Sequence, residues 1–157
     1  IGYDIHQIDT KSKTGLKLCG VKINSNKLIG HSDADVGFHA ICDSIFGALS
    51  MKDIGYYFSN SNPKWKNKNS IYFLKFANHK LKEKNFNIVN LDVNFICEKP
   101  NISKYRKQMI KKISSILQIP EKIISIKATS NEKIGFIGDG LGIAAESIVQ
   151  ISNENIH

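Results

Sequence analysis

The amino-acid sequence predicts a single α+β domain spanning residues 1–157. In several short segments apolar side chains alternate with polar ones, as in strands with one buried face; in others they recur at spacings of three and four, as in amphipathic helices. Both kinds of segment are interspersed along the chain, and no internal repeat, low-complexity block or interdomain linker separates them. At 157 residues with 41% hydrophobic residues, the chain is long enough to bury a core.

The N-terminal part of the chain is expected to contain two strand segments. Residues 1–8 alternate between apolar and polar side chains and are expected to form the first strand. Asp4 and His6 would project from the same face of it, because side chains two apart in a strand share a face. Residues 16–23 are expected to form a second strand or a hairpin arm, with Gly20 as a bend or bulge.

A central helix is expected from residue 33 to residue 49. Ser32 followed three places later by Asp35 has the spacing of a capping box, which predicts the start of the helix. His39 lies outside the apolar stripe, and Asp35 and Asp43 lie one turn to either side of it. The apolar stripe that would face the core contains Phe38, Ile41, Cys42, Ile45 and Leu49.

The remaining elements alternate between helices and strands. Residues 51–65 have no clean period and are expected to be a mobile loop, and residues 135–142 are expected to be a flexible glycine-rich loop. Pro120 is expected to begin a short turn. The expected helices are 70–84 and 102–117, and the expected strands are 86–98, 124–129 and 143–151.

Composition argues against several functional classes. The formal charge is +8, but only Arg106 among the 22 basic residues is arginine, and bidentate recognition of bases or phosphates favours arginine. We therefore expect no nucleic-acid partner, although positive charge suits phosphorylated small molecules. No apolar run is long enough to span a bilayer, so no membrane partner is expected. Cys19, Cys42 and Cys97 show no CxxC pairing and are expected to be buried thiols in a reducing compartment.

Asp4, His6 and His39 form the first candidate constellation. Zinc accepts imidazole nitrogens and carboxylate oxygens, and catalytic zinc keeps three protein ligands and one open position. Two ligands from a strand and a third from a helix can converge if the helix packs across the strand. The alternative is a surface Asp–His pair and an unrelated helical histidine, which these residues alone favour slightly because D-x-H is common by chance.

Two polar turns form the other candidate constellations. Residues 129–132 (Thr-Ser-Asn-Glu) follow an expected strand, where hydroxyls and N–H groups suit phosphate oxygens and Glu132 could hold Mg²⁺. A helix cap or a polar turn is the more common use of such residues. Asp53 stands beside the permissive Gly55 in a loop, and by itself this pair indicates only a turn.

Taken together and in order, these motifs resemble the 2-C-methyl-D-erythritol 2,4-cyclodiphosphate synthase family of the non-mevalonate isoprenoid pathway. The matching segments span nearly the whole chain, and the first of them begins directly after Ile1, so we expect that a few family residues at the start of the first strand are missing here. They are Gly2-Tyr-Asp-Ile-His6, His31-Ser-Asp-Ala-Asp35 with His39, Asp53-Ile-Gly55, Glu98-Lys-Pro100 and residues 127–136 (Lys-Ala-Thr-Ser-Asn-Glu-Lys-Ile-Gly-Phe).

The resemblance implies a mixed sheet of four to five strands covered by helices on one face, with the sheets packing together in a homotrimer whose active sites lie at subunit interfaces. It also implies a reaction. The 2-phosphate of 4-diphosphocytidyl-2-C-methyl-D-erythritol 2-phosphate attacks the diphosphate phosphorus next to the erythritol, which expels CMP and closes the cyclodiphosphate. The enzyme would be a divalent-metal-dependent phosphorus–oxygen lyase that positions its substrate and neutralises charge.

The resemblance further implies a role for each matching residue. Asp4, His6 and His39 would hold one Zn²⁺ per subunit, and Glu132 would help to hold Mg²⁺ or Mn²⁺ on the substrate diphosphate. His31 and Ser130 would stabilise the transition state. The remaining substrate-binding residues would be Ser32, Asp53, Ile54, Gly55, Phe58, Asn60, Phe136 and Asp139. The nucleotide-binding residues would be Cys97, Pro100, Asn101, Ile102, Ser103, Ala128, Thr129 and Ser130.

Three positions depart from the family pattern. Asn60 replaces a frequent Asp, Asn101 replaces a lysine of some members, and Asp139 replaces a common Arg, so a charged contact is in doubt at each. The pathway operates in plastids and in bacterial cytoplasm. The composition, rich in Lys, Asn and Ile, favours a plastid-type organelle (apicoplast or chloroplast), with bacterial cytoplasm as the alternative.

Two other functions compete with the cyclase. A small zinc-dependent phosphohydrolase would use the same metal centre to activate water, but Asp35 is the single candidate for its general base. A basic, non-catalytic nucleotide- or RNA-binding domain would show affinity that falls steeply with salt and needs no metal.

Overall fold

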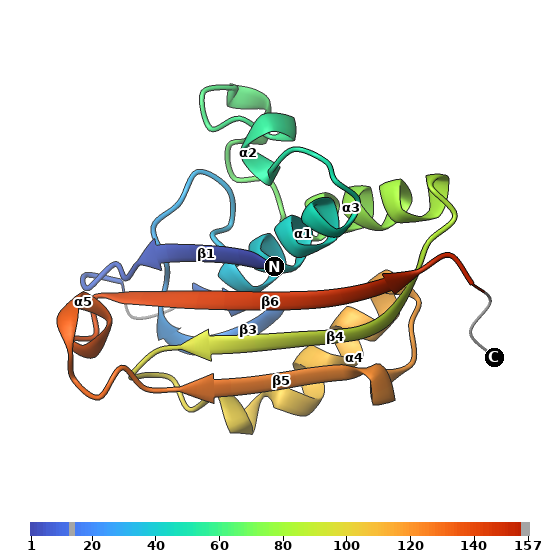
Figure 1. Ribbon diagram of the computed structural model, residues 1–157. Coiled ribbons are helices and arrows are strands. Elements are labelled where there is room, and N and C mark those ends of the chain that lie inside the picture. Colours follow the sequence, from blue (N-terminus) through green and yellow to red (C-terminus); the bar gives the residue numbers. More distant parts are fainter. Residues whose placement is uncertain (13–14, 155–157) are drawn as a thin grey trace.

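The computed structural model describes residues 1–12 and 15–154, and it is built on a four-stranded mixed sheet in the order β1-β6-β4-β5 (Figure 1). β6 pairs antiparallel with β1 and β4, whereas β4 and β5 are parallel. A separate two-stranded hairpin joins β2 to β3. The strands are β1 (Gly2–Gln7), β2 (Gly15–Leu18), β3 (Val21–Asn26), β4 (Asn87–Ile96), β5 (Ile124–Thr129) and β6 (Gly142–Ser152).

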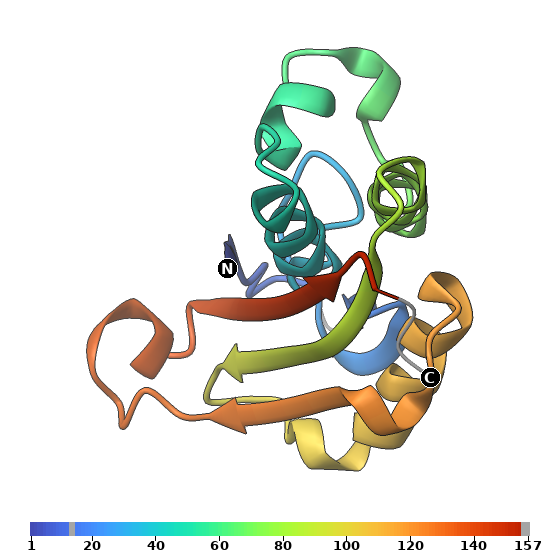
Figure 2. The ribbon, with the colours of Figure 1, turned by 45° about the vertical axis from the view of Figure 1, so that its right-hand side comes forward.

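Helices cover one face of this sheet, as the family resemblance implies. The helix α1 packs on β1 and β6, α4 packs on β5, and α3 lies against both helices. Figures 1 and 2 show α1 and α4 on the same side of the sheet. The helices are α1 (Val36–Ala48), α3 (Ile71–Glu83), α4 (Arg106–Leu117) and the one-turn α2 (Ile54–Tyr57) and α5 (Gly135–Gly138). Short 3₁₀ turns are η1 (Pro63–Trp65), η2 (Ile102–Lys104) and η3 (Glu121–Ile123).

The predicted capping box at the start of α1 is wrong. Asp35, not Ser32, is the N-cap residue, and its carboxylate accepts a hydrogen bond from the Phe38 N–H at 3.2 Å. The same carboxylate also accepts hydrogen bonds from the backbone N–H groups of Cys19 (2.7 Å) and Gly20 (2.6 Å), at the tip of the β2–β3 hairpin. The helix begins three residues later than residue 33 because the Asp35 carboxylate, which also bonds the hairpin tip, caps it.

Both expected loops contain short helices. Residues 51–65 include α2 and η1, and the side chains of Phe58 and Trp65 are buried against Phe73 of α3. The glycine-rich segment 135–142 contains α5. Single helical turns carry too few residues for a hydrophobic period, and here burial of aromatic side chains stabilises the first segment. The helix expected over 102–117 is also divided, into η2 and α4.

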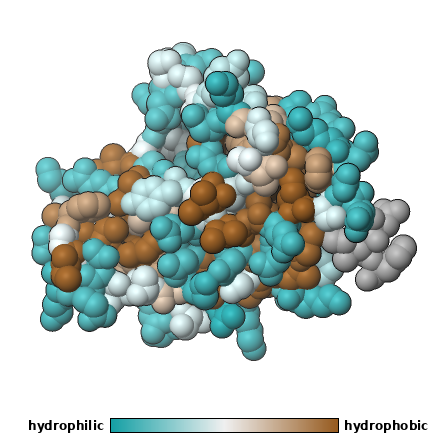
Figure 3. Space-filling model, viewed as in Figure 1, coloured by the Kyte–Doolittle hydropathy of each residue, from teal (hydrophilic) through white to brown (hydrophobic). Residues whose placement is uncertain are grey.

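The core lies between the sheet and its helices, and it includes the thiols of Cys19, Cys42 and Cys97, all buried as expected. The opposite face of the sheet exposes apolar side chains, which Figure 3 shows in brown among polar ones. Ile148 of β6 and Tyr3 of β1 are 57% and 51% exposed. Within residues 1–12 and 15–154, no helix is long and apolar enough to cross a membrane.

Candidate functional site

Asp4, His6 and His39 converge because α1 crosses β1. Asp4 and His6 project from one face of β1, and His39 lies in the first turn of α1. The Oδ2 atom of Asp4 lies 2.8 Å from Nδ1 of His39 and 3.0 Å from Nε2 of His6, and the two histidine nitrogens are 3.5 Å apart. Among the described residues, this is the one group of three ligand-type side chains with all donor atoms within 4.8 Å of one another.

The donor set fits a zinc ion. Tetrahedral zinc with bonds of about 2.05 Å separates its ligand atoms by about 3.3 Å, close to the three separations in this cluster. The far side of each imidazole is also hydrogen-bonded: Nδ1 of His6 donates to the Ile29 carbonyl oxygen at 2.9 Å, and Nε2 of His39 lies 2.9 Å from the Ser70 hydroxyl. Such partners orient metal-binding histidines so that the other nitrogen faces the ion.

The electrostatics of the cluster favour a charged acid beside two imidazoles. Burial alone would raise the pKa of Asp4, but hydrogen bonds from His39 and His6 and their charges hold it well below its usual range. Burial alone would lower the pKa of His6, whereas the hydrogen bond and charge of Asp4 raise it. The carboxylate therefore stays ionised at neutral pH and can bind a cation.

The cluster opens into a cavity of about 120 Å³. His31 and Ser32 line it from the segment before α1, and Nε2 of His31 lies 3.3 Å from the Asn62 carbonyl oxygen. Trp65 and Phe73 also line the cavity, and neither was predicted from the sequence. The available signal was Trp65, a large aromatic residue in an otherwise polar loop. The other predicted substrate-binding residues in this cavity are Ile54, Gly55, Phe58 and Asn60.

Asp53 does not line this cavity but shapes the segment that does. It is the N-cap residue of α2, and its carboxylate accepts a hydrogen bond from the Tyr56 N–H at 2.9 Å. Asp43 of α1 accepts a hydrogen bond from the Ile54 N–H at 2.7 Å. The first bond caps α2 and the second anchors it to α1, which places Ile54 and Gly55 beside the donor cluster.

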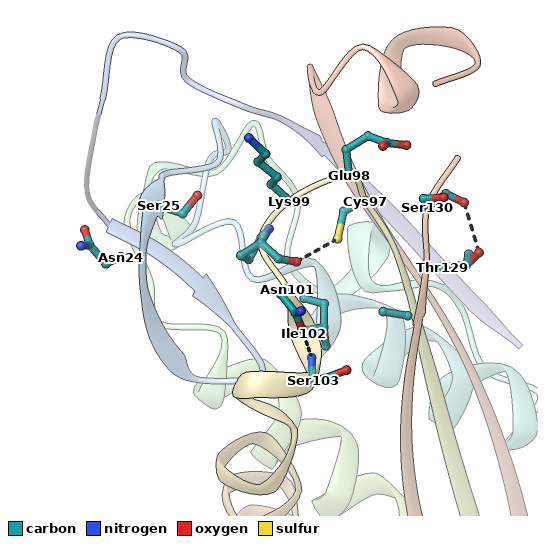
Figure 4. A pocket seen from close by; sticks show the side chains of 12 residues that line it. Asn24, Ser25, Cys97, Glu98, Lys99, Asn101, Ile102, Ser103, Thr129 and Ser130 are labelled. Atoms are coloured by element: carbon teal, nitrogen blue, oxygen red, sulfur yellow. Dashed lines mark hydrogen bonds between the residues drawn. The ribbon is translucent and has the colours of Figure 1, made fainter. Parts of the chain in front are cut away.

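A second cavity, of about 600 Å³, contains all of the predicted nucleotide-binding residues, which follow β4 (97 and 100–103) or end β5 (128–130) (Figure 4). The two segments meet because β4 and β5 are parallel neighbours, so their carboxyl ends lie at the same edge of the sheet. Glu98 and Lys99, from the matching segment Glu98-Lys-Pro100, also line this cavity. Asn24 and Ser25 of β3 line it as well, and neither was predicted. Burial raises the pKa of the Cys97 thiol to about 11.

The predicted magnesium ligand stands apart from the donor cluster. Glu132 is exposed, and its Oε1 accepts a hydrogen bond from the Ser130 hydroxyl at 2.6 Å. Nearby, the Glu98 carboxylate accepts one from the Asn131 N–H at 3.0 Å. Glu132 and Ser130 are thus neighbours at the rim of the nucleotide cavity.

Phe136 and Asp139 are two further predicted substrate-binding residues that do not line the donor-cluster cavity. Phe136 lies on α5 with 57% of its surface exposed. Asp139 lines a further cavity of about 490 Å³, together with Lys99 and Lys133.

Comparisons with known proteins identify the family of this chain. The YgbB family model matches residues 1–152. The chain is 47% identical over 152 residues to a bifunctional enzyme IspD/IspF of Wolbachia pipientis, covering 94% of this chain but 38% of that relative. It is 42% identical over 160 residues to the 2-C-methyl-D-erythritol 2,4-cyclodiphosphate synthase of Ehrlichia canis, covering 99% of this chain and 92% of the relative.

Solved structures agree as well. The structure described as IspF (Plasmodium falciparum) CDP complex superposes with a TM-score of 0.86 at 43% identity, covering 98% of this chain and 94% of that chain. The family match covers both the fold and the motifs that carry the donor cluster. This chain therefore belongs to the YgbB family, the family of the 2-C-methyl-D-erythritol 2,4-cyclodiphosphate synthases.

Proposed function

We propose that this chain converts 4-diphosphocytidyl-2-C-methyl-D-erythritol 2-phosphate into 2-C-methyl-D-erythritol 2,4-cyclodiphosphate and CMP. An oxygen of the 2-phosphate forms a bond to the diphosphate phosphorus next to the erythritol, and the bond from that phosphorus to the CMP oxygen breaks. The observation that carries this proposal is the convergence of Asp4, His6 and His39 at a cavity lined by other motif residues of the family. Residues 1–157 would form one catalytic domain.

The donor cluster would hold Zn²⁺ through one atom from each of Asp4, His6 and His39. When bound, the ion supplies a Lewis acid that draws negative charge from a diphosphate oxygen. His31, at the same cavity, would donate to the attacking phosphate. Phe58 and Trp65 would exclude water, which favours ring closure by the substrate's own phosphate over hydrolysis.

The second cavity would bind the cytidine and its phosphates. Ser130 lines this cavity and would stabilise the leaving nucleotide, while Glu132 would help to hold Mg²⁺ or Mn²⁺ on the diphosphate. The structure described as IspF (Plasmodium falciparum) CDP complex supports a cytidine diphosphate ligand for this family. Oδ1 of Asn101 accepts a hydrogen bond from the Ser103 N–H at 3.0 Å, which caps η2 beside the cavity (Figure 4).

A homotrimer would bring the two cavities together. The donor-cluster cavity and the nucleotide cavity share no lining residue within one chain. The sheet face opposite the helices exposes Ile148 and Tyr3, and burying it against two further copies would remove this apolar surface from water. We propose that sheets pack together in this way and that each substrate contacts two subunits.

The cellular location follows the relatives. The curated relatives named above come from the bacteria Wolbachia and Ehrlichia, so they support bacterial cytoplasm and not the plastid-type organelle that composition favoured.

The test is a product assay by phosphorus NMR with the cytidylated erythritol phosphate, Mg²⁺ and zinc. We expect CMP and a cyclic diphosphate from the wild type and from His79→Ala, which removes an exposed histidine of α3, but not from His39→Ala. Circular dichroism would establish that both variants fold. CMP with an open-chain phosphate would identify a hydrolase, and equal turnover by His39→Ala would refute the metal centre.

A further inference from the structure

A chain of hydrogen bonds runs from the metal-facing histidine into the protein interior. Nε2 of His39 lies 2.9 Å from the Ser70 hydroxyl, and that hydroxyl contacts Oδ1 of Asp33. The Ser70 N–H also donates to Oδ1 of Asp33, at 3.1 Å. The second carboxylate oxygen of Asp33 accepts a hydrogen bond from the Lys17 ammonium at 2.7 Å. Ser70, Asp33 and Lys17 were not among the predicted site residues.

The partners at the far end settle the direction of each hydrogen bond. An Asp33 carboxylate that faces a lysine ammonium offers only acceptor atoms, so the Ser70 hydroxyl donates its proton to Asp33. The lone pairs of that hydroxyl then remain for a donor, which must be the N–H at Nε2 of His39. His39 therefore carries a proton on Nε2, and Nδ1 is the nitrogen left to face Asp4, His6 and a bound ion.

Burial makes this chain hard for solvent to replace. Ser70 has no exposed surface, and His39 is 9% exposed. Ser70 also occupies the N-cap position of α3, yet its hydroxyl makes no capping hydrogen bond to that helix. Serine at an N-cap ordinarily contributes to helix stability through such a bond. Here the hydroxyl contacts His39 and Asp33 instead, so the helix forgoes that contribution.

We propose that Ser70 and Asp33 are positioning residues of the metal centre, which hold the His39 imidazole in the tautomer and orientation that present Nδ1 to the ion. This inference rests on the metal centre of the proposed function. Ser32 also approaches Nε2 of His39, at 3.2 Å, but its oxygen accepts from the Ala34 N–H and contacts no carboxylate that would fix its direction.

The first test locates the proton on His39. Nitrogen-15 NMR of the imidazole rings in zinc-loaded protein distinguishes a zinc-bound Nδ1 with a proton on Nε2 from the reverse arrangement, and His39→Ala identifies the resonances. We expect wild-type His39 to carry its proton on Nε2. In Ser70→Ala we expect a mixture of tautomers, a change that a merely structural serine would not produce. A proton on Nδ1 in the wild type would overturn the proposal.

The second test measures zinc affinity by competition with a chelator. We expect Ser70→Ala and Asp33→Asn to bind zinc about 10- to 100-fold more weakly than the wild type. Ser70→Thr, which keeps a hydroxyl, should recover most of that affinity. The matched control is Ser44→Ala: Ser44 is an equally buried serine of α1 whose hydroxyl contacts Ile41 and Ser147, so its loss should leave zinc affinity unchanged.

The outcomes separate this inference from the proposed function. A wild type that binds no zinc would refute the metal centre and the positioning role together. Zinc binding by the wild type that is equally tight in Ser70→Ala, Asp33→Asn and Ser44→Ala would refute the positioning role alone. Thermal unfolding of each variant, measured in parallel, shows whether weaker zinc binding accompanies a folded protein.

Discussion

Gly2 allows β1 to lie directly on α1, and replacing it with alanine should disrupt the metal centre. A Cβ atom at Gly2 would lie 2.0 Å from the Ala40 carbonyl oxygen and 2.6 Å from the Ser44 nitrogen. Both atoms belong to the backbone of α1, so no side chain can rotate away. Gly2 is also paired with Ser147 of β6, which holds this end of β1 in register. The strand and the helix must therefore separate.

The size of that separation can be worked from the contact. Moving the Cβ atom from 2.0 Å to an ordinary contact of about 3.5 Å requires a shift of about 1.5 Å. β1 carries Asp4 and His6 whereas α1 carries His39, so the same shift enters the distances within the donor cluster. Metal sites tolerate about 0.2 Å in each ligand distance. Overpacking of this kind costs about 1 to 3 kcal/mol of stability.

The assay combines zinc titration, turnover and thermal unfolding of Gly2→Ala. We expect zinc affinity to fall at least about tenfold, which needs a change of only about 1.4 kcal/mol, and turnover to fall about 100-fold. Gly47→Ala is the matched control, because its Cβ would lie 3.7 Å from the Ile1 carbonyl oxygen and should be accommodated in α1. If Gly2→Ala binds zinc as tightly as Gly47→Ala, the close approach of β1 to α1 does not set the ligand geometry.

Three further predictions concern His6, Phe58 and Cys97. In metal-free protein the raised pKa of His6 contributes stability that is fully present below pH 6.5 and is lost as the pH rises through the raised pKa. The midpoint of thermal unfolding should therefore fall with rising pH. A midpoint independent of pH would contradict this prediction. Zinc should reverse the dependence, since the zinc-bound imidazole carries no extra proton while the unfolded one still binds a proton below about pH 6.5, and a chelator should restore the original trend. Phe58→Ala should lower the free energy of unfolding, measured in urea, by about 3 kcal/mol, because the Phe58 side chain is buried. Tyr56→Ala, at an exposed side chain, should lower it by less than about 0.5 kcal/mol. Equal losses would show that burial of Phe58 does not stabilise the fold. Burial raises the pKa of Cys97 from 9.0 to about 11, so its reaction with a disulfide reagent at pH 8 should be about 100-fold slower than that of an ordinary thiol. Bound CDP should slow the reaction further. A reaction rate that reaches its plateau by about pH 9 would exclude the pKa shift.

Periodicity was sufficient for the long elements of the fold. The strand expected over 86–98 is β4, and the helix expected over 70–84 is α3, because each has enough turns or alternations for one buried face to show. Periodicity failed for α2, η1 and α5, which are too short to show a period. The spacing of Ser32 and Asp35 also misplaced the cap of α1, because both residues are good N-cap residues. The contacts of Asp35 with the β2–β3 hairpin, which decide between them, cannot be read from local sequence.

The sequence by itself determined the chemical types of the site: two ligands spaced by two along β1, a histidine one turn into α1, and motif residues in the order typical of one family. Local spacing carries that information because strand and helix periods place neighbouring side chains. Only the tertiary structure decided that the donors meet, through the close contact of β1 with α1 at Gly2. It alone also joined Ser70 and Asp33 to His39, since these hydrogen bonds connect residues 31 and 37 positions apart and depend on how α1 and α3 pack.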